Sequence, residues 1–140
     1  MAARTKARKR AIDILFEADQ RGANLSDVLA ERIAMSGRET PVPQYGIDIV
    51  RGVIDQWLSI NALISEAAKE WTMDRMPAVD RAVLRVATWE IVFNDEVPAA
   101  VAINEAVDLA ADLSTNDSPT FVNGVLGAIA RDASAPGAQA

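Results

Sequence analysis

Apolar residues recur every three or four positions along almost the whole chain, and this spacing constrains the fold more than any other feature of the sequence. It is the period at which side chains return to one face of an α-helix. No run of four to eight residues alternates apolar and polar side chains cleanly enough to indicate a half-buried strand. The sequence therefore predicts an all-α fold with about seven helices.

Helix caps and helix breakers locate the ends of the predicted helices. Gly22 and Gly37 follow the first two, and Pro77, Pro98 and Pro119 are suited to the first turns of the last three. The segment 44–69 is long for one helix, so we expect two helices, or one bent helix, with a break near Trp57 to Asn61. The remaining predicted helices cover about 4–21, 25–35, 77–93, 98–113 and 118–131, and the stretch 38–44 is a predicted loop.

The chain has 140 residues, half of them apolar, which is the size and composition of one globular domain. We expect this domain over 1–131, with an arginine-rich basic segment at 1–10, and a disordered tail over 132–140. No window is apolar enough to cross a membrane, and Asp13 interrupts the apolar residues that a secretory signal requires. We therefore expect a soluble, cytoplasmic protein without a membrane partner.

The chain contains no cysteine and no histidine, which excludes several kinds of chemistry. Disulfides, Cys/His zinc sites, Ser-His and Cys-His dyads and histidine general bases all need one of these residues. Glu105, Asp108 and Asp112 share one helix face, where they could hold a hard cation or form an acid/base pair, but a solvated face is the commoner use of such a pattern. No phosphate-binding loop or EF-hand motif occurs. We predict no enzymatic activity, no metal and no cofactor.

The strongest functional signal is the basic segment. The first ten residues carry five cationic side chains and no acid, whereas the other 130 carry nine basic and 20 acidic ones. Cations at a helix N-terminus oppose the helix dipole, so stability gives no reason for them. Contact with nucleic acid is the favoured interpretation, and a solubilising, disordered N-terminus is the alternative. The five cations are Arg4, Lys6, Arg8, Lys9 and Arg10.

The aromatic residues give a weaker signal. Trp57, Trp71 and Trp89 lie in or beside apolar stripes, which favours core filling over stacking on nucleobases. Phe121 follows a predicted helix start, where it could either face a ligand or anchor the core. Asn123 lies within an apolar helix, so we expect it to satisfy a buried backbone group.

Four segments of the chain carry a family resemblance. They are ARKRAIDILFEAD at 7–19, PAVDRAVLRVATWEI at 77–91, VPAAVAINEAVDLAADLS at 97–114 and DSPTFVNGVLGAIA at 117–130. In this order and at this separation they resemble the NusB family of bacterial transcription antitermination factors, and the C-terminal half is similar to actinobacterial members. The resemblance implies two small helical bundles packed at a steep angle.

The resemblance also implies a function. NusB-like proteins bind single-stranded boxA RNA of ribosomal RNA operon leaders together with NusE, a small-subunit ribosomal protein. They thereby help RNA polymerase antitermination complexes to transcribe ribosomal RNA genes processively. Actinobacterial members also form homodimers that cover the basic surface. By position, the resemblance implies an RNA surface of Arg4, Lys6, Arg8, Lys9, Arg10, Arg81, Asp117 and Phe121, and a NusE contact at or beside Phe16 and Asp80.

Two other functions remain open at this point. NusB-like domains also occur as RNA-binding modules fused to ribosomal RNA cytosine methyltransferases, although this chain has no cofactor-binding glycine loop and no cysteine nucleophile. The other is a helical adaptor that binds only protein, and salt-sensitive RNA binding would distinguish the antitermination factor from it.

Overall fold

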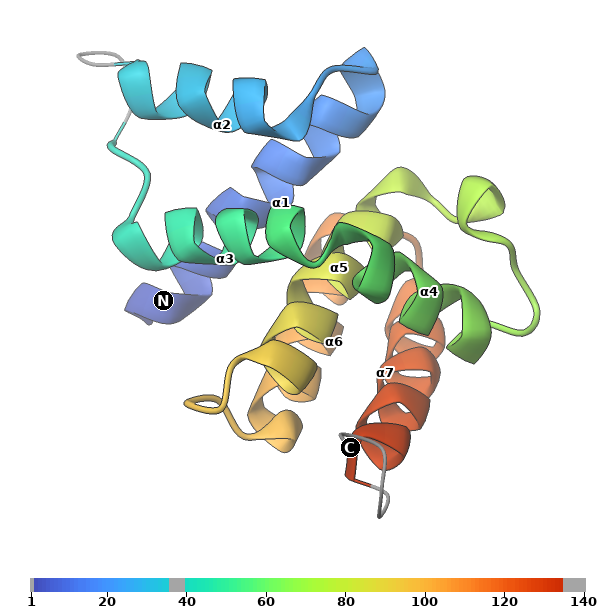
Figure 1. Cartoon of the computed structure of the whole chain (residues 1–140). Helices are drawn as coiled ribbons and strands as arrows, with labels where there is room; N and C mark the ends of the chain where they lie inside the picture. The colour runs from blue at the N-terminus through green and yellow to red at the C-terminus, as the bar shows by residue number, and fades with distance from the viewer. Residues whose placement is uncertain (1, 36–39, 135–140) are drawn as a thin grey trace.

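Seven α-helices and one short 3₁₀ turn account for most of the computed structural model, which describes residues 2–35 and 40–134 (Figure 1). The helices are α1 (Ala3–Arg21), α2 (Leu25–Ala34), α3 (Gln44–Asp55), α4 (Trp57–Ala67), α5 (Ala78–Phe93), α6 (Ala99–Leu113) and α7 (Ser118–Ser134), and the 3₁₀ turn is Met73–Arg75. The described residues contain no strand, so the predicted all-α fold is confirmed. The predicted break in 44–69 falls at Gln56, just before Trp57.

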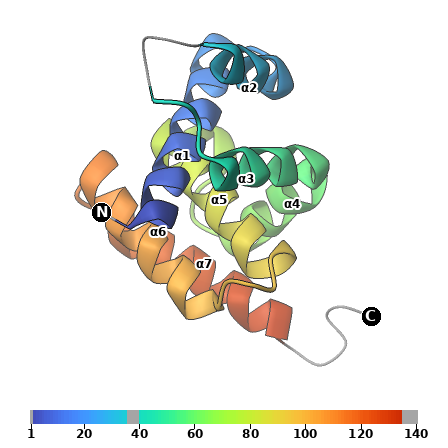
Figure 2. The same ribbon diagram turned by 90° about the vertical axis from the view of Figure 1, so that its left-hand side faces the viewer.

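The helices form two small bundles that share α5 as a neighbour. Helices α1 to α3 pack on one another, α4, α6 and α7 pack around α5, and both α1 and α3 also contact α5. In Figure 1, α3 runs across α5, and Figures 1 and 2 both place α6 beside α7. The two crossed bundles expected from the family resemblance are therefore confirmed.

Helix α5 is buried on nearly all sides, as its dense apolar pattern predicts. Every residue from Ala82 to Thr88 is buried, and so is Glu90. Helices on several sides of α5 remove its apolar side chains from water, which is the main favourable term in folding. Polar groups carried by α5 are therefore fixed in the interior, where they need partners of opposite charge or hydrogen bonds.

Two glycines are required by the backbone. Gly22 ends α1 in the left-handed conformation, with φ of 61°, which a residue without Cβ adopts at no steric cost. Gly52 allows α3 to approach α5, because a Cβ at this position would lie 2.0 Å from Nε1 of Trp89. The second glycine therefore sets how closely the two bundles meet.

The ends of the described residues differ slightly from the prediction. Helix α7 continues through Ser134, past the expected start of the tail at residue 132, and the rest of that tail, 135–140, lies outside the described residues. Residues 38 and 39 of the predicted loop also lie outside them, and 40–43 are not helical. No helix among the described residues is long and apolar enough to cross a membrane.

Candidate nucleic-acid interface

The basic segment is helical from Ala3 onward, where it forms the N-terminal part of α1. Its first turn has no acidic residue and no side-chain cap, so nothing local offsets the positive end of the helix dipole. Lys6 is exposed, and Lys9 and Arg10 are half-buried. With Arg4, whose side chain is 47% exposed, four cations of the segment reach the surface.

Arg8 is an exception, because the structure places its side chain in the interior rather than at the surface. Its side chain is 4% exposed and is bound by the carboxylate of Glu90, with Nε 2.8 Å from Oε1 and Nη2 2.9 Å from Oε2. The Tyr45 hydroxyl donates to Glu90 Oε2 at 2.5 Å, and Glu105 lies 3.2 Å from Arg8 Nη1. Burial opposes the charged form of Arg8, but the hydrogen bond and charge of Glu90 outweigh it and raise the pKa of Arg8. Arg8 therefore fixes α1 to α5.

The four surface cations differ in the contacts that their side chains already make within the protein. Arg4 lies 3.3 Å from Glu96 and 4.4 Å from the ring centroid of Tyr45, in an ion pair that is exposed to solvent. Arg10 donates to the Thr40 carbonyl at 2.9 Å. Lys6 and Lys9 form no ion pair within the described residues, and they are three positions apart on one face of α1. These two lysines are therefore the most available to a phosphate.

An acidic helix lies beside the basic segment. The hydroxyl of Thr5 donates to Glu105 Oε1 at 2.8 Å, and a hollow of about 490 Å³ next to this contact is lined by Asp108 and Asp112 of α6. The acidic face predicted from the sequence thus borders the cations and would repel RNA on that side. No group of three or more Asp and Glu side chains in the described part of the chain is arranged to hold a metal ion.

Asp80, which the family resemblance puts at or beside a partner contact, is fully buried. Its carboxylate accepts hydrogen bonds from Ser114 Oγ at 2.6 Å and from Ser118 Oγ at 2.9 Å. These hydrogen bonds attach the start of α5 to the connection between α6 and α7. Asp80 can therefore influence a nearby ligand only by holding this turn in place.

Arg81 is also largely occupied by internal contacts. Its Nε donates to Asp19 at 2.9 Å, and its Nη1 donates to the carbonyls of Met73 and Met76 at 2.8 Å each. Arg81 thereby holds the 3₁₀ turn against the end of α1. Along α1, Asp19 lies 15 residues from Arg4, or about 22 Å at 1.5 Å per residue. The structure thus places Arg81 at the opposite end of α1 from the basic segment.

Two aromatic rings form an exposed platform near the start of α7. The ring centroids of Phe121 and Trp71 are 5.0 Å apart, and Trp71 is 40% exposed. Together with Lys69 and Asp117 they line a groove of about 580 Å³ between α7 and the end of α4. The apolar neighbours of Trp71 predict a place in the core, but Trp71 lies four residues beyond Ala67, where α4 ends. This place in a connection between helices is the signal that could have identified it.

Phe16 and Asn123 lie on α1 and α7, respectively. Phe16 is half-buried on α1 and lines a hollow of about 700 Å³ together with Arg10 and Arg32. Asn123 is exposed on α7, so the expectation that it satisfies a buried backbone group is wrong. The expected RNA residues consequently fall into two groups, one at the N-terminus of α1 and the other around the N-termini of α5 and α7.

Comparisons with known proteins identify the family of this architecture. The NusB family model matches residues 5–131. Transcription antitermination protein NusB of Beutenbergia cavernae is 55% identical over 139 residues, covering 94% of this chain and 91% of that protein. T. maritima NusB has a TM-score of 0.80 at 32% identity, covering 93% of this chain and 92% of its own. A chain from the crystal structure of antitermination factors NusB and NusE in complex with dsRNA has a TM-score of 0.73 at 26% identity, covering 91% and 96%.

Proposed function

This chain belongs to the NusB family, and from that premise we propose that it is a transcription antitermination factor that binds boxA RNA of ribosomal RNA operon leaders together with NusE. The observation that carries the proposal is the group of four surface cations held on a preformed helix by the buried pair of Arg8 and Glu90. A preformed helix reduces the conformational entropy that binding must remove, compared with a disordered basic arm.

The two groups of surface residues suit different parts of an RNA strand. The four cations, Arg4, Lys6, Lys9 and Arg10, would bind phosphates and supply affinity that falls with salt. The platform of Trp71 and Phe121 would stack with unpaired bases, and the exposed carboxylate of Asp117 beside it could accept hydrogen bonds from base amino groups. An extended single strand could contact both groups.

A protein partner is the second part of the proposal. Outside the basic segment the chain is strongly acidic, so its own surface repels RNA over most of its area. NusE would add RNA-binding surface, and half-buried Phe16 is the residue of this chain that we propose to lie at that contact. We place the factor in cytoplasmic RNA polymerase antitermination complexes, where it catalyses no reaction.

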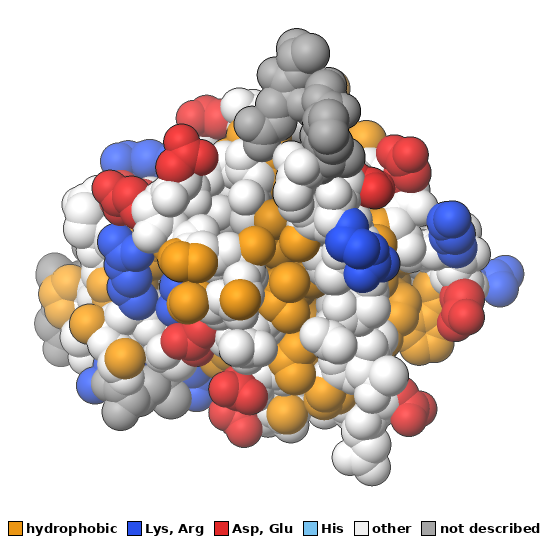
Figure 3. Space-filling model, turned by 90° about the horizontal axis from the view of Figure 1, so that it is seen from below, with side chains coloured by type: hydrophobic (Ala, Val, Ile, Leu, Met, Phe, Trp, Pro, Cys, Tyr) orange, Lys and Arg blue, Asp and Glu red, His pale blue; other side chains and the backbone are white. Residues whose placement is uncertain are grey.

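Figure 3 shows a band of apolar side chains on the face seen from below, with charged side chains on both sides of it. Apolar surface of this kind is suited to contact with protein rather than RNA. We propose that this band is available to a protein partner. We also propose that a homodimer that covers the basic segment would compete with RNA for that segment.

Fluorescence anisotropy with labelled single-stranded boxA RNA, with and without NusE over a salt series, tests the proposal. The informative variant is Lys6→Gln/Lys9→Gln, and its matched control is Arg51→Gln/Arg75→Gln, which removes two exposed cations elsewhere. The slope of log K against log salt is negative, and we expect the lysine variant alone to make it less steep by about 1.4, or roughly 0.7 for each lost phosphate contact on single-stranded RNA.

Two results would overturn this function. If no RNA binds even with NusE, an adaptor that binds only protein becomes the better account. If both double variants reduce RNA binding equally, then net charge rather than the basic segment governs it.

A further inference from the structure

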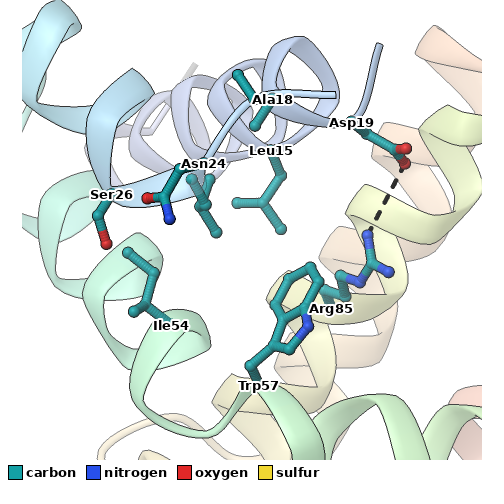
Figure 4. Close-up of a pocket in the computed structure, with 10 residues that line it drawn as sticks. Leu15, Ala18, Asp19, Asn24, Ser26, Ile54, Trp57 and Arg85 are labelled. Carbon is teal, nitrogen blue, oxygen red and sulfur yellow. Dashed lines mark ion pairs between the residues drawn. The ribbon is translucent and has the colours of Figure 1, made fainter. Parts of the chain in front are cut away.

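A cavity of about 390 Å³ lies at the junction of the two bundles (Figure 4). Leu15 and Ala18 of α1 and Ile54 of α3 supply apolar walls, and Trp57 lies at the start of α4. Arg85 of α5 is beside the indole, with its guanidinium carbon 4.3 Å from the ring centroid. The cavity thus combines an aromatic ring and apolar walls with one cationic side chain.

Two nitrogens of Arg85 have no hydrogen-bond acceptor among the described residues. The residue is 9% exposed, and its Nε donates to Asn61 Oδ1 at 2.9 Å. Its Nη1 lies 3.9 Å from Asp19 Oδ2, which is beyond hydrogen-bonding distance. Within the described residues, neither Nη1 nor Nη2 of Arg85 donates a hydrogen bond to any group. Neither nitrogen is fully enclosed by protein, so both are accessible from the cavity to water or to a ligand.

The charge around Arg85 is also incompletely balanced. Asp19 already accepts from Arg81 Nε at 2.9 Å, so one carboxylate serves two guanidinium groups. Burial lowers the pKa of Arg85 to about 10, and the charge of Arg81 contributes in the same direction, while Asp19 opposes both. A ligand with hydrogen-bond acceptors would complete this site. Because Asp19 repels a second anion, a neutral ring with acceptors fits better than a carboxylate or phosphate.

We propose that this cavity binds a guanine base, whose O6 and N7 accept hydrogen bonds from Nη1 and Nη2 of Arg85 while its ring packs against Trp57 and the apolar walls. Guanine presents two adjacent acceptors on one edge, which is the pattern that arginine binds with two hydrogen bonds. Adenine and cytosine place an amino donor on the corresponding edge, and uracil has a single acceptor there. Trp57 is 37% exposed, so the aromatic side of the cavity is accessible from solvent.

The base could belong to RNA or to a free guanosine nucleotide, and the recognition chemistry is the same. The cavity adjoins the second group of proposed RNA residues, because Arg81 and Arg85 share Asp19. Binding of RNA there would provide base specificity in addition to the phosphate contacts of the basic segment. This part of the inference rests on the proposed function, whereas binding of a free nucleotide does not.

NMR of the full-length, ¹⁵N-labelled chain tests the site through the indole N–H resonance of Trp57, assigned with Trp57→Phe. We expect GMP to shift this resonance saturably and AMP, CMP and UMP to bind at least about five-fold more weakly. The nucleotide 7-deaza-GMP, which lacks the N7 acceptor, should also bind at least about five-fold more weakly than GMP.

Arg85→Lys keeps the charge but loses the two-pronged donor geometry. We expect it to weaken GMP binding at least about five-fold and to abolish the difference between GMP and 7-deaza-GMP. The matched control is Arg51→Lys, at an exposed position of α3 outside the cavity, and it should bind GMP as the unaltered chain does. The comparison of GMP with 7-deaza-GMP on the unaltered chain needs no variant, so it remains decisive if Arg85→Lys folds poorly.

The outcomes distinguish failure of the guanine site from failure of the proposed antitermination function. If GMP binds as expected but boxA RNA does not bind with NusE, the guanine site stands and the antitermination function fails. If RNA binds, single 7-deazaguanosine substitutions in it should weaken binding at one guanosine in the unaltered chain but not in Arg85→Lys. The site is disproved if GMP leaves the Trp57 resonance unchanged, or if all four nucleotides shift it equally.

Discussion

The guanidinium of Arg8 and the carboxylate of Glu90 form a two-pronged ion pair in which the side chains are only 4% and 1% exposed. The pair joins α1 to α5, the helix that both bundles share. Position 8 lies within the run of cations that the sequence presents as one basic segment, yet only this member is inside the protein. The buried member therefore determines how its exposed neighbours are presented.

Removing one partner of this pair should destabilise the fold strongly. Arg8→Met leaves the Glu90 carboxylate buried without its counterion, and we expect the free energy of unfolding to fall by about 3–5 kcal/mol. Arg8→Met/Glu90→Leu should be less destabilising than the sum of the single variants, because it leaves no uncompensated charge. Urea denaturation measures all three. If the losses in unfolding free energy of the two single variants simply add in the double variant, packing rather than the ion pair dominates. Arg131→Met, at an exposed position, is the control.

Gly52→Ala should destabilise the junction of the two bundles. The added methyl group would lie 2.0 Å from Trp89 Nε1, so either α3 or the indole must move. We expect a loss of about 1–3 kcal/mol, which is typical of overpacking. Gly124→Ala is the matched control, because its Cβ meets nothing within 4 Å, and it should stabilise α7 by about 0.5–1 kcal/mol. Thermal unfolding followed by circular dichroism measures both, and equal effects would contradict the close approach.

Glu96→Gln should strengthen RNA binding by releasing Arg4. Glu96 is exposed and lies 3.3 Å from Arg4, so it competes with a phosphate for this guanidinium. Because the pair is solvated, we expect a gain of only about two-fold in affinity, present at low salt and absent at high salt. Glu66→Gln, at an exposed position of α4, makes the same change in net charge and should have a smaller effect in the same anisotropy titrations.

Glu17 should make stability depend on pH in the acid range. It accepts hydrogen bonds from Arg32 and, at 2.7 Å, from Arg21 Nη1, and these lower the pKa of Glu17 below its usual 4.5. As the pH falls, Glu17 therefore takes up a proton in the unfolded state before it does so in the folded state. The stabilisation is complete above about pH 4.5 and is lost as the pH falls through the lowered pKa of the folded state. Glu17→Gln should flatten this decline in urea unfolding from pH 6 to 3, and an unchanged slope would show that the carboxylate contributes little.

The exposed platform should contribute to RNA binding through ring stacking. Trp71→Ala should cost about 1–3 kcal/mol of RNA-binding free energy, the value for one stacked base, whereas Trp71→Phe should keep most of it. Phe93→Ala removes a similarly exposed ring outside this groove and should leave RNA binding unchanged. Anisotropy titrations compare the three variants, and equal losses from the alanine and phenylalanine variants at position 71 would rule out stacking.

The sequence by itself determined which segments are helical. Spacing of apolar residues and caps such as Gly22 act over one or two turns, so they can be recognised without knowledge of the rest of the chain. The same local signals separated α3 from α4 close to Gln56. The dense apolar pattern of 77–93 also predicts that α5 is buried on most sides, and the structure agrees.

Only the tertiary structure decided which charged residues remain available to a ligand. Arg8 and Lys6 lie in the same basic run, but one faces Glu90, 82 residues away, and the other faces solvent. Asp80 is satisfied by two serines 34 and 38 residues further along, and Arg85 meets Trp57 where several helices converge. Helix formation depends on near neighbours, whereas burial and charge pairing depend on which helix faces meet, and that is fixed only when the two bundles pack.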